Sequence, residues 1–320
     1  MLCILYSTRY GHGIATGHMQ AHTQNLISQK RSNSAKTFFL MALFFVAIIF
    51  LGFIISYSTG NVSYLYGAFY ASLAMNFFSY FFSAKIALST SGAEKADKEK
   101  YKELYDIMTS LTHTARIKMP VLYIINDPAP NAFATGRNEN NASIAVTTGL
   151  LATMNKNELE GVLAHELSHI QNKDILIMTI VVVLAGTLSM LAHFTLQRSM
   201  YSSSEDRGGS TVLSLVVGII ASIVLPLAAT IVQLSISRKR EFMADASGAL
   251  ITGHAEGLAS ALEKIGNFSQ PLQRATNATA HLYIANPFGG KIKQAYFQKL
   301  FMTHPPLEER IAVLRGESPL

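Results

Sequence analysis

Four long apolar stretches dominate the hydrophobic pattern of this chain: Thr37–Tyr57, Ser63–Ser83, Ile175–Leu196 and Thr211–Leu234. None contains Asp, Glu, Lys or Arg, and about 20 apolar residues are enough for a helix to cross a bilayer. A buried core helix usually keeps a polar face, which these stretches largely lack. The pattern therefore predicts four transmembrane helices. The second is rich in Tyr and Ser and carries Asn76, so whether it spans fully stays open.

Between the second and third apolar stretches, apolar and polar residues alternate over short distances, as is typical of a folded domain. Ala93–Thr114 is predicted to be an amphipathic helix, because its apolar residues are spaced for one helix face. Short segments bounded by turn residues then predict strands. The predicted strands are Val121–Ile125, Asn131–Thr135 and Ser143–Thr148.

The helix predicted next carries the most informative motif of the chain. Asn155 is a good N-cap and Glu158 follows three residues later, a capping-box arrangement. Within this helix lies the HExxH motif His165-Glu166-Leu167-Ser168-His169. Residues four apart lie on one helix face, so both imidazoles can bind one zinc ion. Zinc lowers the pKa of a water molecule that it binds, and Glu166 can take the proton as general base.

Catalytic zinc usually has three protein ligands, so a third must come from elsewhere in the chain. Glu241 lies just after the fourth apolar stretch, as the motif lies just before the third. A transmembrane hairpin would thus return Glu241 to the zinc. Asp245, one helical turn further on, is placed to hydrogen-bond a ligand histidine. The simpler interpretation of Glu241 is a juxtamembrane charge beside the basic cluster Arg238–Arg240.

Charge is scarce and unevenly placed. Only 14% of the residues are charged, against about a quarter in soluble domains. The net charge of +6 comes from basic residues that flank the apolar stretches, which argues against a nucleic-acid partner. Because such residues mark the cytoplasmic side, both termini and the motif are expected in the cytoplasm, and Ser58–Val62 and Gln197–Ser210 outside. The single Cys3 gives no basis for an intramolecular disulfide or a cysteine-ligated zinc site.

Four ordered segments carry a resemblance to a known family: Asn131–Gly136 (NAFATG), Ala164–Asp174 (AHELSHIQNKD), Ser237–Ala246 (SRKREFMADA) and Thr303–Arg310 (THPPLEER). Together they resemble the HtpX-type membrane zinc proteases of bacteria, which are similar to the CAAX prenyl proteases and have a gluzincin core. The resemblance covers the chain from about residue 36 to its end. The polar segment before it is longer than is usual in that family and lacks a secretory signal; Met19 is an alternative start.

The apolar pattern and the resemblance together predict a mainly α membrane protein of the bacterial inner membrane, in which four transmembrane helices carry a cytoplasmic, zincin-like α+β domain with a small β-sheet. The resemblance also implies one zinc ion per chain and an endopeptidase that acts on damaged or misfolded membrane proteins in the stress response. The expected order is a polar segment (1–36), two transmembrane helices (37–83), a cytoplasmic region with the motif (86–174), a transmembrane hairpin (175–234) and a cytoplasmic helical region with the third ligand (235–320).

Two further roles are hypotheses. His304 precedes Pro305-Pro306, which start a helix, and it could donate a hydrogen bond to the charge that develops on the substrate carbonyl; the alternative is that it only caps that helix. In the resembled family a histidine of this motif lies near the zinc, and its arginine, here Arg310, supports the site. An edge strand could bind extended substrates through main-chain hydrogen bonds, or be merely structural. Its residues are Asn131, Ala132, Phe133, Ala134, Thr135 and Gly136.

Two other classes of function stay open. One is a prenyl-protein protease of narrow specificity, although such enzymes have more spans around a large chamber. The other is a non-catalytic polytopic scaffold or transporter with an incidental motif. Ionisable groups inside spans would favour transport, and only His193 lies in one. His193 is interpreted as a packing residue, and Asn172 and Asp174 as the end of the motif helix. Substrates, regulators and oligomeric state are not determined by the sequence.

Overall fold

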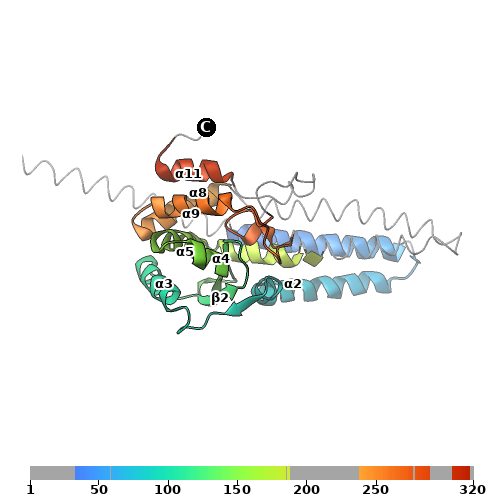
Figure 1. Ribbon diagram of the computed structural model, residues 1–320. Coiled ribbons are helices and arrows are strands. Elements are labelled where there is room, and N and C mark those ends of the chain that lie inside the picture. The colour runs from blue at the N-terminus through green and yellow to red at the C-terminus, as the bar shows by residue number, and fades with distance from the viewer. Residues whose placement is uncertain are drawn as a thin grey trace, which may run out of the picture.

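The computed structural model describes residues 33–57, 59–184, 186–187, 238–276, 278–288 and 305–317. Cys3, His193, the expected span Thr211–Leu234 and His304 therefore lie outside the described residues. Figure 1 shows two long helices that extend from one end of a cluster formed by the remaining helices and the sheet.

The two long helices correspond to the first two apolar stretches. Asn33–Tyr57 is a helix of 25 residues that is long and apolar enough to cross a membrane. The second, α2 (Ser63–Thr90), has 28 residues. The two pack so closely that a Cβ built on Gly52 would lie 2.2 Å from the Cβ of Ala68. Both are lined by exposed aromatic side chains, among them Phe53 and Phe78.

The prediction of four spans is not confirmed. Among the described residues, Asn33–Tyr57 is one helix that qualifies as a span by itself, and α2 is not a second. Of the third stretch, residues 175–184 lie in the described helix Asp174–Leu184, which is bent by 86° from the motif helix. That bent pair would count as a second span only if both helices were taken together.

A small mixed sheet lies beneath the motif helix. Its order is β1-β2-β4-β3, with β2 and β4 parallel and the two outer pairs antiparallel. The three predicted strands are confirmed to within one residue. The strands are β1 (Ala93–Lys95), β2 (Val121–Ile125), β3 (Ala132–Gly136) and β4 (Ala142–Thr147).

The predicted helix Ala93–Thr114 begins too early. Residues 93–95 form β1, which pairs with the end of β2, and the helix α3 runs only from Lys102 to Ala115. Asp97 separates the two elements, because its side chain accepts hydrogen bonds from the backbone N–H groups of Glu99 and Lys100. The apolar face of α3 was predicted correctly, since Leu104, Ile107, Met108 and Leu111 are all buried.

The motif helix α5 (Lys156–Gln171) packs against β3 of the sheet, and two further helices, α8 (Arg238–Thr252) and α9 (Glu256–Asn267), pack against α5. Its capping box is present: Asn155 N donates to Glu158 Oε2 (2.8 Å) and Glu158 N donates to Asn155 Oδ1 (3.0 Å). The other helices are η1 (Glu139–Asn141), α4 (Thr148–Thr153), η2 (Ala280–Leu282) and α11 (Leu307–Arg315).

Two glycines allow α8 and α9 to approach α5 closely. A Cβ on Gly161 of α5 would lie 2.6 Å from the backbone nitrogen of Leu258 in α9. A Cβ on Gly248 of α8 would lie 3.0 Å from the backbone nitrogen of His165. The first contact leaves no room for a side chain, and the second brings α8 against the motif itself.

Candidate metal centre

The motif helix presents both histidines on one buried face. His165 and His169 are 0% and 3% exposed, and their Nε2 atoms lie 3.2 Å apart. The spacing of four residues places them one turn apart on α5, so their rings can meet around a common point. Glu166, between them in sequence, is also buried.

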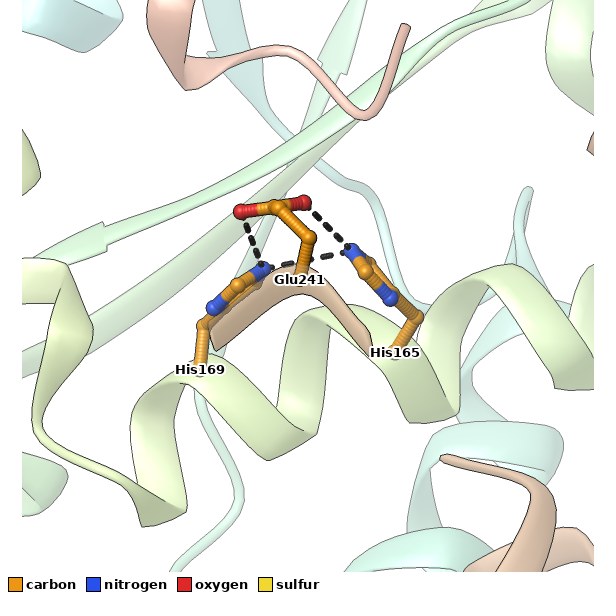
Figure 2. Close-up of side chains that lie close together, drawn as sticks. All are labelled: His165, His169 and Glu241. Carbon is orange, nitrogen blue, oxygen red and sulfur yellow. Dashed lines mark hydrogen bonds and ion pairs between the residues drawn. The ribbon is translucent and has the colours of Figure 1, made fainter. Parts of the chain in front are cut away.

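Glu241 approaches the two histidines from α8. Its Oε2 lies 3.9 Å from His165 Nε2 and its Oε1 lies 3.9 Å from His169 Nε2. Figure 2 shows the carboxylate facing both rings. One ligand atom from each of the three residues lies within 4.8 Å of the others. The structure thus brings together the three residues that the sequence analysis selected.

Each histidine contacts a carboxylate through its Nδ1 atom. His165 Nδ1 lies 2.8 Å from Asp245 Oδ1, and His169 Nδ1 lies 3.1 Å from Asp174 Oδ2. A carboxylate at Nδ1 accepts the ring proton there, so it leaves Nε2 as the metal-binding atom and fixes the ring orientation.

Arg310, on α11, forms an ion pair with Asp245. Its guanidinium donates from Nε to Oδ2 (2.9 Å) and from Nη2 to Oδ1 (2.7 Å) of Asp245, and from Nη1 to the carbonyl of Ile284 (2.8 Å). Arg310 is completely buried. The arrangement joins α11 to α8 and, through Asp245, to His165.

The surrounding charges shift the pKa values of the two histidines in opposite directions. Burial lowers the pKa of His165 to about 4, against the opposing hydrogen bond to Asp245. Burial also disfavours charged His169, but the hydrogen bond to Asp174 and the Glu241 carboxylate outweigh it and raise the pKa of His169 to about 9. A metal ion binds only the deprotonated Nε2 of an imidazole, so a divalent cation that binds there must displace any proton on that atom.

The donor set fits zinc. Two imidazole nitrogens and one carboxylate are a ligand set of catalytic zinc in peptidases, and tetrahedral bonds of about 2.0–2.2 Å need ligand atoms roughly 3.3–3.6 Å apart. The separations of 3.2, 3.9 and 3.9 Å bracket that range. After burial and the larger effects of Asp174 and Glu241, the Glu166 carboxylate adds to the raised pKa of His169.

The predicted substrate strand is an edge of the sheet beside the site. All five residues of β3 are buried, and Asn131 is buried before it, with its amide donating to the carbonyl of Ala285 (3.2 Å). Asn131 O accepts from Thr147 N on β4, whereas Ala132 O accepts from Ile284 N (both 3.0 Å). Because an antiparallel ladder alternates, the backbone groups of Ala134 also point away from β4.

Asp174 is a site residue that sequence reasoning missed. It was expected only to end the motif helix, yet it contacts His169. Lys173 has a left-handed backbone conformation (φ 59°), and the chain bends by 86° between α5 and the following helix. That turn brings Asp174 back to the ring five residues earlier. The sequence signal was an acidic residue between the motif and an apolar stretch.

A helix that carries HExxH, together with an acidic residue from a second helix, defines a metallopeptidase centre. The comparisons agree. The model of peptidase family M48 matches residues 98–318, and the chain belongs to this family. It is therefore a metalloprotease.

Curated relatives match almost their whole length. A "Protease HtpX homolog" of Campylobacter hominis is 44% identical over 87% of this chain and 96% of its own. Those of Campylobacter curvus and Caldanaerobacter subterraneus are 45% and 42% identical, over 88% and 92% of this chain and 96% and 98% of their own. The HtpX-type resemblance is thereby confirmed. No solved structure matches.

Proposed function

We propose that the protein is a membrane-embedded zinc endopeptidase that cleaves damaged or misfolded membrane proteins on the cytoplasmic side. The observation that carries the proposal is the buried cluster of His165, His169 and Glu241, in a chain with a helix able to cross a membrane. In this proposal the three residues hold one zinc ion.

Zinc bound there would lower the pKa of a water molecule and polarise the scissile carbonyl. Glu166 would accept the proton of the attacking water and pass it to the leaving amine. Asp245 and Asp174 would hold the ligand rings through Nδ1, and Arg310 would keep Asp245 ionised. His304 is proposed as a donor to the developing oxyanion.

The main-chain groups of Ala134 are proposed to bind an extended substrate beside β3. A strand added at a sheet edge is held by backbone hydrogen bonds, which explains tolerance of many sequences. Ala134→Pro removes the N–H and should raise KM or abolish cleavage with zinc retained, whereas Ala134→Ser keeps the N–H and should cleave normally. Equal kinetics of the two variants would mean that the strand is only structural.

Four membrane crossings with a cytoplasmic catalytic domain remain part of the proposal. Most exposed large hydrophobic side chains of the described residues lie on the helix Asn33–Tyr57 and on α2, a surface suited to lipid. A reporter active only outside the cytoplasm should signal when fused within residues 197–210 and stay silent at Leu320. The reverse pattern would refute this orientation.

The catalytic proposal is tested with Glu166→Gln in the full-length protein purified in detergent. We expect zinc content equal to that of the wild type and loss of casein cleavage, because the general base is removed while the ligands remain. Glu160→Gln is the matched control, since Glu160 lies on the same helix and its carboxylate pairs with Lys156 and His254, each at 3.9 Å. Glu166→Gln with wild-type turnover, or with zinc lost in parallel, would refute the role of Glu166.

A further inference from the structure

Asn33, at the start of the helix Asn33–Tyr57, lies at the metal centre, although it is 132 residues from the motif. It is only 3% exposed. Its amide nitrogen donates to Asp174 Oδ1 and to the carbonyl of Asn172 (3.2 Å). Its amide oxygen accepts from Arg240 Nη1 (3.4 Å). Both the nitrogen and the oxygen of the amide are therefore hydrogen-bonded within one small polar cluster.

The two carboxylate oxygens of Asp174 contact different residues. Oδ2 lies 3.1 Å from Nδ1 of the ligand His169, whereas Oδ1 accepts from Asn33. A carboxylate held at one oxygen can rotate less, so the donor on Oδ1 orients Oδ2 toward the ring. Asn33 is thus linked to a proposed metal ligand through a single intermediate side chain.

Arg240 joins the same cluster from the other half of the site. Its Nη1 lies 4.0 Å from Asp174 Oδ1, and it directly precedes the third ligand, Glu241, on α8. The Asn33 amide therefore bridges the end of α5 and the start of α8, where the ligands of the centre meet. Asn33 lies outside residues 98–318 that the family model matches.

We propose that Asn33 is a positioning residue of the metal centre, which couples the first apolar helix to His169 through Asp174. The inference rests on the proposed zinc site. Asn33, at the polar start of the apolar helix, thereby helps to orient His169, a ligand that lies far away in the sequence. The membrane anchor is then a structural part of the active site and not only a tether.

The test is the zinc affinity of the full-length protein in detergent, measured by competition with a chromogenic chelator. Loss of a group that supports a ligand histidine typically weakens metal binding about 10–100-fold. We expect Asp174→Ala to fall in that range and Asn33→Ala at its lower end, about 10-fold. Thr37→Val is the matched control, because Thr37 is equally buried one turn further on and its hydroxyl donates to Asn33 O within the same helix.

A double substitution separates positioning from general packing. If Asn33 acts through Asp174, adding Asn33→Ala to Asp174→Ala should weaken zinc binding by no more than about 2-fold further. Equal affinity of Asn33→Ala and Thr37→Val, or a full additional loss in the double variant, would overturn the inference. A wild-type protein without zinc affinity would instead refute the proposed zinc site, so the two failures are distinguishable.

Discussion

Arg310→Met tests how strongly the buried ion pair between Arg310 and Asp245 stabilises the fold around the site. The two side chains are 0% and 2% exposed, and two hydrogen bonds join them, of 2.9 and 2.7 Å. Burial raises the pKa of Asp245, but the Arg310 guanidinium outweighs it and holds that pKa at about 2. The carboxylate therefore stays charged in the interior because its cation is present.

Removing one partner of such a pair costs about 3–5 kcal/mol, since a buried charge loses its compensation. For a domain of roughly 150–250 residues, 1 kcal/mol shifts Tm by about 2–4 °C. We therefore expect Arg310→Met to lower Tm by roughly 10 °C, measured by circular dichroism in detergent with a chelator present. Adding Asp245→Asn should recover most of the loss, because neither charge then remains buried.

Arg315→Met is the matched control on the same helix. Arg315 pairs with Glu256 and Glu263, whose side chains are 64% and 53% exposed, and exposed pairs contribute only about 0–1 kcal/mol. Its Tm should fall by at most a few degrees. An Arg310→Met protein with the same Tm as the Arg315→Met control would contradict the stabilising role of the pair.

Three further outcomes are expected. Gly161→Ala should lower Tm by several degrees, because its Cβ would lie 2.6 Å from the backbone nitrogen of Leu258; an unchanged Tm would show that α9 can move away. Burial raises the pKa of Glu158, but the hydrogen bonds from Lys264 (2.6 Å), the Asn155 backbone and Ser260 together outweigh it, so the pKa lies below its usual value. Because Gln keeps the capping-box acceptor but loses the ion pair with the 43% exposed Lys264, Glu158→Gln should lose up to about 1 kcal/mol of unfolding free energy at pH 7. This loss should shrink as pH falls below about 4.3, and a loss that does not change with pH would refute it. His304→Ala should reduce kcat about 10²–10³-fold with Tm and bound zinc unchanged, whereas a loss of stability with normal turnover would identify His304 as a cap.

Local signals in the sequence predicted the parts of the fold that depend on local interactions. The capping box of Asn155 and Glu158 located α5 and thereby the HExxH face. β1 was mistaken for helix because its strand state comes from pairing with β2, which lies 30 residues further on. Propensity cannot show such a tertiary contact.

The candidate site was predictable where a residue type and a position both pointed to it. Glu241 could be selected because an acidic residue followed the apolar hairpin that starts after the motif. Asp174 and Asn33 could not, since their roles depend on the left-handed turn at Lys173 and on where the first apolar helix begins in space. Neither feature produces a recognisable pattern of apolar and polar residues in the sequence.

The zinc content of Glu241→Ala tests the central claim most directly, because Glu241 reaches the motif only through the fold. Full-length wild-type protein should carry one zinc ion per chain, and a site left with two histidines binds zinc weakly. Metal analysis after dialysis should therefore find Glu241→Ala nearly free of zinc, while Glu256→Ala, at an exposed glutamate of α9, keeps the wild-type amount. Full zinc occupancy in Glu241→Ala would contradict the account.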